Sequence, residues 1–362
     1  MTVAAIQHPI RIQELESLRG IAAALVVLYH IPKWGGIGNI GIINNSYLMV
    51  DLFFVLSGFV IFSAYDGKIT GVRDLLRFQF LRFGRLYPVH ILFLLFFAGL
   101  EALKHGLAMG NPFAGNTVAT FVQNLFLAHA IWPGSMMSYN WPSWSISVEF
   151  YTYLLFGIIA LGLGKLRLVA YAALTIVPMT LLAFGNDLAS PGPMRGFSGF
   201  FLGCILARAL QGRAVALPAY SSTATLLLLA AYLHFKTGTS VDWLMFPLTA
   251  VLVATLLLET PNFMQRVFRF RTFIWLGTIS YTIYMAQAAV MWTASQILRF
   301  VANKPAMTMP DGTLLAQLTP LEGVAAFVCV YATVLLASQI VYTTVEKPLR
   351  EYSRKIAFSK MG

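Results

Sequence analysis

The sequence predicts an all-α polytopic membrane protein with about ten transmembrane helices. Hydrophobic residues make up 58% of the 362 residues and charged residues only 11%, with a mean hydropathy of +0.73. Soluble domains carry roughly 25% charged residues, so this chain has too few charges to cover a surface that faces water. Long apolar runs such as LYPVHILFLLFFAGL and TATLLLLAAYL point the same way, because a helix needs about twenty apolar residues to cross a bilayer.

Ten segments are long and apolar enough to be transmembrane helices. They lie at 15–33, 47–65, 86–103, 146–164, 168–185, 196–211, 221–236, 243–259, 273–298 and 322–345. A further apolar stretch, 118–132, is interrupted by polar residues, and we expect a re-entrant or interfacial piece there. The polar amino-terminal residues carry no cleavage pattern, so we expect the first span to be an uncleaved anchor. With no internal repeat visible, residues 1–362 are expected to form a single membrane domain with short termini.

The basic residues predict the orientation of the chain. With the amino terminus in the cytoplasm, 19 of the 25 Lys and Arg residues fall on the inner side, as the positive-inside rule requires. The six others are Lys33, Lys104, Arg195, Lys236, Arg299 and Lys304. Both termini are therefore expected in the cytoplasm. The net charge of +11 follows one membrane face, which argues against nucleic acid as the partner.

Two ionisable residues of the first span share one face. Arg19 and His30 are eleven positions apart, which is within about 20° of three full helical turns and about 16 Å along the axis. Arg19 then lies near the cytoplasmic boundary and His30 near the outer one. Charged groups in membranes are costly and commonly functional. The alternatives are an interfacial anchor for Arg19 and an interfacial hydrogen-bonding role for His30.

Four further ionisable residues are expected at the two membrane boundaries. Asp51 and Glu149 stand near the outer ends of the second and fourth spans, at a depth similar to that of His30. Arg82 and Arg85 precede the third span, at the inner mouth. Either acid could instead cap a helix, and either arginine could anchor one.

This arrangement suits acyl transfer from a donor that carries phosphate. A guanidinium group is always charged and binds oxygen pairs in a fork. A histidine can accept the proton of a hydroxyl that attacks a thioester, and a carboxylate on its other ring nitrogen would fix the tautomer. The distance between the two groups is comparable to the reach of an extended phosphopantetheine arm. Coenzyme A bound from inside could thus present its acyl group near His30.

Other catalytic patterns are missing from the sequence. It contains no G-x-S-x-G elbow, no Walker-type phosphate loop, no dinucleotide fingerprint and no metal-ligand spacing. Ser57 is interpreted as a small packing residue beside Gly58. The remaining alternative is a transporter or flippase that uses the ionisable residues as a substrate or proton pathway. The paired halves common in transporters are not visible.

Six motifs in order resemble a single family. They are LESLRGIAAALVVLYH, VDLFFVLSGFVIF, LRFGRLYP, WSISVEFY, GTISYTIYMAQ and VEKPLR. Together, over nearly the whole chain, they resemble the acyltransferase-3 family of integral membrane acyltransferases. The resemblance implies a ten-helix domain of the bacterial inner membrane that takes acyl groups, commonly acetyl, from cytoplasmic acyl-coenzyme A. The implied acceptor is a hydroxyl of a surface or exopolysaccharide sugar, of its lipid-linked precursor, or of a small molecule such as a macrolide.

The resemblance also implies roles for individual residues. Arg19 and His30 match the pair in the family's first helix, and Arg82 and Arg85 match its R-x-x-R motif. Glu149 matches the acid of the family's tryptophan–serine–glutamate segment. The arginines would hold the phosphates of acetyl-coenzyme A, and the histidine would be the general base or a transient acyl carrier.

Two points stay open at this stage. Either Asp51 or Glu149 would orient His30. Gln287 stands where many relatives carry histidine, so this chain either dispenses with that group or uses Gln287 as a hydrogen-bonding substitute. The chain ends soon after the last span, and we therefore expect no esterase-like outer domain.

Overall fold

Helices account for most of the chain in the computed structural model, which describes residues 12–107, 115–132, 137–185, 191–213, 215–308 and 314–360. The α-helices are α1 (Gln13–His30), α2 (Gly41–Asn44), α3 (Met49–Tyr65), α4 (Val72–Gly106), α5 (Val118–Leu125), α6 (Trp144–Gly162), α7 (Arg167–Ala183), α8 (Pro191–Leu210), α9 (Ser221–Phe235), α10 (Met245–Leu258), α11 (Phe263–Phe268), α12 (Arg271–Thr278), α13 (Ser280–Gln296), α14 (Pro320–Val341) and α15 (Lys347–Lys360). Shorter helical elements are η1 (Trp34–Asn39), η2 (Ser46–Leu48), η3 (Trp141–Ser143), η4 (Gly164–Leu166), η5 (Asp242–Leu244), η6 (Ile297–Val301) and η7 (Tyr342–Glu346). Strands β1 (Ala306–Thr308) and β2 (Leu314–Ala316) pair antiparallel, with Met307 opposite Leu315.

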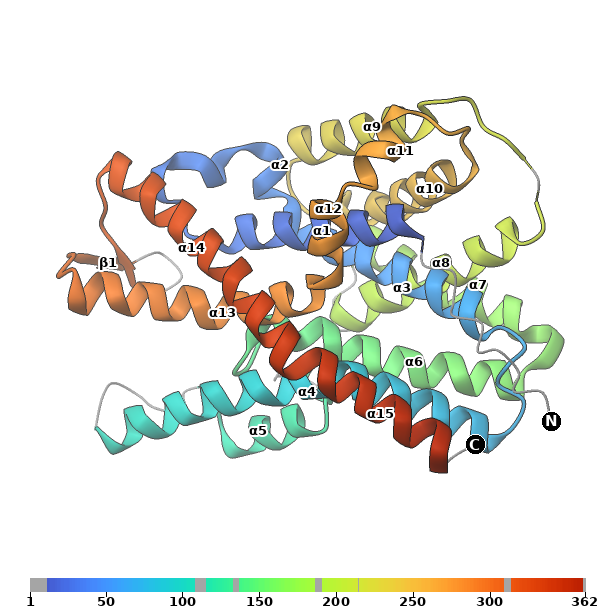
Figure 1. The fold of residues 1–362 in the computed structure, drawn as a ribbon, viewed down its shortest axis with the longest axis horizontal. Coiled ribbons are helices and arrows are strands. Elements are labelled where there is room, and N and C mark those ends of the chain that lie inside the picture. Colours follow the sequence, from blue (N-terminus) through green and yellow to red (C-terminus); the bar gives the residue numbers. More distant parts are fainter. Residues whose placement is uncertain are drawn as a thin grey trace.

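Helix α1 lies at the centre of the bundle, against α3, α12 and α13 (Figure 1). It crosses α12 where Gly20 meets Gly277: a Cβ on either residue would overlap with the backbone of the other helix. The same device joins α3 to α8, because side chains on Gly58 and Gly203 would overlap with facing carbonyl groups. Small residues let membrane helices approach closely, so these glycines fix the position of α1 and α3.

Helix α4 begins much earlier than the sequence predicts. The predicted span begins at residue 86, but α4 runs unbroken for 35 residues from Val72, with Pro88 inside it. The helix starts at 72 because Asp74 accepts hydrogen bonds from the backbone of Thr70 and Gly71. Proline is tolerated inside membrane helices where neighbouring groups replace the lost hydrogen bond.

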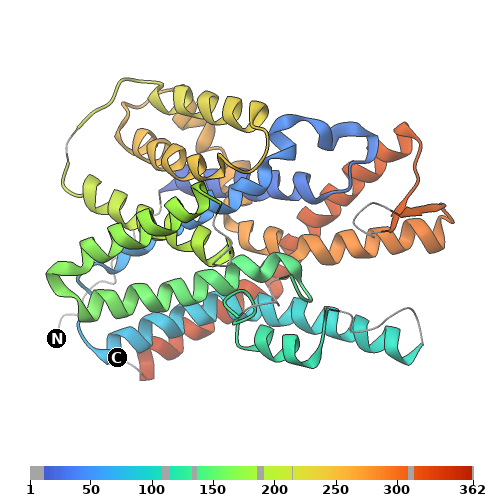
Figure 2. The ribbon, with the colours of Figure 1, turned by 180° about the vertical axis from the view of Figure 1, so that it is seen from behind.

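The last span also continues beyond its predicted end. Helix α14, the π-helical η7 and α15 form one rod from Pro320 to Ser359. In Figure 1, α15 runs along the amino-terminal half of α4. Figure 2 shows α6 beside α4 on the other side, with α5 along the far half of α4.

Five helical stretches of the described chain are long and apolar enough to cross a membrane: Ser46–Tyr65, Val72–Gly106, Trp141–Gly162, Gly164–Ala183 and Pro320–Ser359. A sixth is counted if the bent pair of α12 and α13, which meet at 67°, forms one span. Large apolar side chains face outward on these and other helices, Leu321 and Leu227 for example at 81% and 67% exposure. An all-α membrane protein accounts for such a surface, whereas the count of ten spans stays a prediction.

The segment 118–132, predicted to be re-entrant or interfacial, contains the eight-residue helix α5. Its side chains Val118 and Val122 are exposed, while Asn124 is buried. A helix this short spans only about 12 Å and cannot cross a bilayer.

Candidate active site

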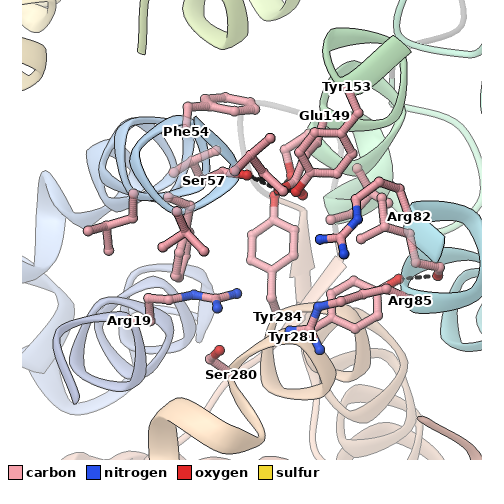
Figure 3. Close-up of a pocket in the computed structure, with 18 residues that line it drawn as sticks. Arg19, Phe54, Ser57, Arg82, Arg85, Glu149, Tyr153, Ser280, Tyr281 and Tyr284 are labelled. Atoms are coloured by element: carbon pink, nitrogen blue, oxygen red, sulfur yellow. Dashed lines mark hydrogen bonds between the residues drawn. The ribbon is translucent and has the colours of Figure 1, made fainter. Parts of the chain in front are cut away.

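A cavity of about 110 Å³ lies among α1, α3, α4, α6 and α13 (Figure 3). Its polar lining consists of Arg19, Ser57, Arg82, Arg85, Ser145, Glu149, Tyr153, Ser280, Tyr281 and Tyr284. These five helices carry five of the six sequence motifs, and the sixth, VEKPLR, provides Glu346 as a partner to Arg85. Motifs spread over more than 300 residues of sequence therefore surround one space.

The three arginines expected near one another come together in this cavity. Arg19 projects from α1, and Arg82 and Arg85 project from α4, one turn apart. Figure 3 shows their guanidinium groups directed into the same space. The close crossing of α1 and α12 at Gly20 positions the first of these arginines. The geometry suits an anion with several oxygen atoms.

The arginines are only partly neutralised by other side chains. Arg85 donates to Glu346 at 3.2 Å. Arg82 donates to the hydroxyl of Tyr65 at 3.3 Å and lies over the Tyr65, Phe78 and Tyr153 rings. Within the described chain Arg19 has no hydrogen-bond or ion-pair partner, and the positive charge of Arg85 opposes it. The cavity consequently has an excess of positive charge.

Glu149 faces the cavity, where two hydroxyl groups hold it. Ser57 donates to its Oε1 at 2.7 Å, and the Tyr153 hydroxyl donates to the same oxygen. The Ser57 and Tyr153 hydroxyl oxygens lie 2.8 Å apart. The structure thus gives this carboxylate other partners than the imidazole that the sequence assigned to it.

Asp51 also has a different partner from the one expected. It is 1% exposed, and its two oxygens accept from Nε and Nη2 of Arg195 at 2.8 and 3.0 Å. A second ion pair, between Lys236 and Asp242 at 2.7 Å, lies beside this one. The Tyr47 hydroxyl accepts from Lys236 and donates to Asp242. We call Asp51, Arg195, Lys236 and Asp242 the outer ion-pair cluster. A buried carboxylate takes the nearest guanidinium as partner because an unpaired buried charge is costly.

His30 ends α1 and is oriented by the backbone. Its Nδ1 lies 2.9 Å from the carbonyl oxygen of Val26. A carbonyl only accepts, so Nδ1 carries the proton and Nε2 has a free lone pair. The ring packs against Trp141 and Tyr29, with centroid distances of 4.3 and 4.7 Å. The backbone carbonyl of Val26 therefore fixes the tautomer of His30, a role that the sequence analysis assigned to a carboxylate.

Gln287 is fully buried beside His30. In the described chain neither its Oε1 nor its Nε2 has a hydrogen-bond partner of good geometry. It follows Tyr284 by three residues and Ser280 by seven, so the three share one face of α13. This face runs from the arginine cavity toward the histidine.

Three residues of this region received no role from the sequence: Tyr153, Arg195 and Glu346. Ser57 was interpreted as a packing residue, whereas in the structure it donates to Glu149. Tyr153 follows Glu149 by four residues, a spacing that places both on one helix face and was available as a signal. Glu346 lies in VEKPLR, a motif used only for the resemblance. The partnership of Arg195 with Asp51, 144 residues away, had no local signal.

Comparison with known proteins identifies the family. The model of the acyltransferase-3 family, described as an acyltransferase domain, matches residues 12–343. "Protein 2 in picA locus" of Rhizobium radiobacter is 37% identical over 29% of this chain and 53% of its own length. "Acyltransferase MdmB" of Streptomyces mycarofaciens is 32% identical over 41% of this chain and 38% of its own.

A third relative aligns over more of the chain. "Putative peptidoglycan O-acetyltransferase YrhL" of Bacillus subtilis (strain 168) is 24% identical over 77% of this chain and 48% of its own length. The chain thus spans about half, or less, of the length of these relatives. No solved structure matches it significantly. The family match covers most of the sequence and every helix around the cavity, and the chain belongs to the acyltransferase-3 family.

Proposed function

We propose that the protein is a membrane O-acyltransferase that takes an acetyl group from acetyl-coenzyme A at the inner membrane face. The observation that carries the proposal is the arginine-lined cavity at one end of α1, the helix whose other end bears His30. An anion-binding site and a base thus stand on one rigid element.

The spacing of the two groups fits the donor. Eleven residues of α-helix separate Arg19 from His30, about 16 Å along the axis. Phosphates held by Arg19, Arg82 and Arg85 would leave the pantetheine arm to extend along α1 and α13. Its thioester would then lie near His30, while the nucleotide stays toward the cytoplasm.

The tautomer of His30 fits the base that this reaction needs. The acceptor hydroxyl attacks the thioester carbonyl carbon, and Nε2 accepts its proton as the new carbon–oxygen bond forms. When the tetrahedral intermediate collapses, the carbon–sulfur bond breaks and the leaving thiolate takes the proton from the imidazolium. The products are the ester and free coenzyme A. The Nδ1–H bond to Val26 stabilises the imidazolium meanwhile.

A sugar hydroxyl on the outer side is the acceptor we propose. It belongs to a surface or exopolysaccharide or to its lipid-linked precursor. Support comes from the Bacillus relative, whose name gives peptidoglycan O-acetylation, and from the position of His30 at the predicted outer end of α1. The proposal includes ten spans in the bacterial inner membrane with both termini in the cytoplasm, as the distribution of basic residues requires.

The test uses purified protein in nanodiscs with radiolabelled acetyl-coenzyme A, with and without polysaccharide acceptor. We expect thiol release together with labelled acceptor. His30→Ala should lower the rate about 10²- to 10⁴-fold, the usual contribution of a general base, while donor affinity stays the same. His234→Ala is the matched control, because that histidine is exposed at the end of α9.

Three results would contradict the proposal. Full activity of His30→Ala excludes the base, and absence of donor binding excludes acyl-coenzyme A. Label that crosses a vesicle membrane without entering an acceptor would instead indicate a transporter or flippase. Transfer only to a macrolide or lipid acceptor would keep the reaction and change the substrate.

A further inference from the structure

The positive charge of the cavity continues onto α15. Helix α15 crosses α4 where Gly84 faces Ser353, so closely that a Cβ on Gly84 would overlap with the serine side chain. Arg82 and Arg85 flank this crossing on α4, and Arg350 and Arg354 flank it on α15. The two pairs of arginines are thereby brought against each other.

The Glu346 carboxylate pairs with one arginine from each of the two helices. The Oε1 atom of Glu346 accepts from Arg85 at 3.2 Å and from Arg350 at 3.3 Å, and Glu346 is 1% exposed. Arg354 is within electrostatic reach of the positive charges of Arg350, Arg82 and Arg85. We call Arg19, Arg82, Arg85, Arg350 and Arg354 the inner arginine cluster.

The inner arginine cluster has two arginines beyond the three that line the cavity. Its five guanidinium groups lie near three carboxylates, Glu16, Glu149 and Glu346. The buried Nε atoms of Arg82 and Arg350 have no acceptor in the described chain. A diphosphate carries about two negative charges, and a phosphate monoester adds about 1.5 to 2 more. A ligand that has both groups can engage the three arginines of the cavity with its diphosphate and the two arginines of α15 with its monoester.

We propose that Arg350 and Arg354 form the subsite for the 3′-phosphate monoester of the donor's nucleotide, outside the arginines of the cavity. The inference rests on the proposed function, since it takes coenzyme A as the donor. Arg354 is exposed and Arg350 is partly buried, so the subsite opens outward from the cavity along α15. Because guanidinium binds phosphate oxygens in pairs, one monoester can engage both side chains.

An anionic lipid headgroup has the same chemistry at this boundary, because basic residues there attract acidic phospholipids. The experiment therefore compares coenzyme A with 3′-dephospho-coenzyme A, which differs only in the monoester. Binding constants are measured by calorimetry on the whole protein in nanodiscs of phosphatidylcholine, and again with phosphatidylglycerol added.

We expect the wild-type protein to bind coenzyme A about 10- to 100-fold more tightly than 3′-dephospho-coenzyme A, the range for charge-assisted hydrogen bonds. Arg354→Gln and Arg350→Gln should each reduce this ratio toward one by weakening coenzyme A binding alone. Unchanged affinity for 3′-dephospho-coenzyme A shows in each variant that the protein is folded. Lys355→Gln, which removes a charge next to Arg354 on the same helix, should leave the ratio unchanged.

Other outcomes overturn the inference. A wild-type ratio near one, or a ratio that Arg350→Gln and Arg354→Gln do not change, places the 3′-phosphate elsewhere while the proposed function stands. If Lys355→Gln reduces the affinity ratio as much as the two arginine variants do, the positive charge of α15 acts as a diffuse field and there is no specific subsite. An effect of the arginine variants only with phosphatidylglycerol assigns them to lipid. If wild-type protein binds neither compound, the proposed function itself fails.

Discussion

The inner arginine cluster and the outer ion-pair cluster use the same kinds of side chain in opposite ways. In the outer cluster two cations meet two carboxylates, with Asp51 and the Lys236 side chain each 1% exposed. In the inner cluster five arginines share three carboxylates, Glu16, Glu149 and Glu346, around a cavity. Removing one member of a balanced buried pair destabilises the fold, whereas a cavity with an excess of one sign attracts a ligand of the opposite charge. The comparison separates structural charges from functional ones.

The strongest test of this difference is to break the outer cluster. Asp51→Asn leaves Arg195 without its bidentate partner in a site where its side chain is only 19% exposed. Removing one member of a buried pair costs about 3–5 kcal/mol, so the variant should unfold at a clearly lower temperature in detergent. Its donor affinity should not change, because Arg195 does not line the cavity.

The control for Asp51→Asn is Glu322→Gln, at an exposed pair. Lys304 and Glu322 are 29% and 41% exposed, and pairs of that kind contribute about 0–1 kcal/mol. Glutamine also keeps the capping interaction at Thr319. If Asp51→Asn were as stable as wild type but inactive, Asp51 would belong to the catalytic machinery, as the sequence predicted.

The complementary test removes one charge from the inner cluster. Arg19→Gln should weaken coenzyme A binding about 10- to 100-fold, as expected for a lost charge-assisted contact. Its unfolding temperature should hardly change, because the substitution also relieves repulsion from Arg85. Calorimetry and thermal unfolding are measured on one sample, with Arg271→Gln, exposed at the start of α12, as control. A fall in stability like that of Asp51→Asn would contradict the distinction between the clusters.

The sequence predicted the inner cluster better than the outer one, for a physical reason. Helical periodicity and the cost of charge in a membrane constrain where Arg19, Arg82 and Arg85 can lie, and all three face the cavity. Which cation meets Asp51 depends instead on how α3 and α8 pack, which rests on contacts between glycines and distant carbonyls. Such contacts leave no periodic signal.

The boundaries of the helices were also hard to predict from the sequence. The pattern of apolar residues indicated the third and last spans, but α4 and the α14–α15 rod extend well beyond them. The extensions are polar, so hydropathy does not detect them. They nevertheless carry Arg82, Arg350 and Arg354, because a long helix can bring charges from the membrane boundary to the cavity.

Gln287 belongs to neither cluster and gives the smallest expected effect. Its buried amide contacts His30 but makes no hydrogen bond of good geometry within the described chain, and leaving such a group poorly paired costs about 1–3 kcal/mol. Gln287→Leu, of similar volume, should therefore raise the unfolding temperature slightly and lower the rate of acyl transfer several-fold at unchanged donor affinity. That combination is expected where a side chain is kept for function at the expense of stability.

The control for Gln287→Leu is Gln265→Leu. Gln265 is also buried, at 7% exposure, but donates to the carbonyl of Leu256 at 3.3 Å, so its loss should lower stability. If Gln287→Leu also lowered stability, its amide would have a partner in the folded protein, and its role would be structural like that of the outer cluster. Higher stability with full activity would remove Gln287 from the His30 site. Only higher stability with a slower reaction assigns it to the chemistry at Nε2 of His30.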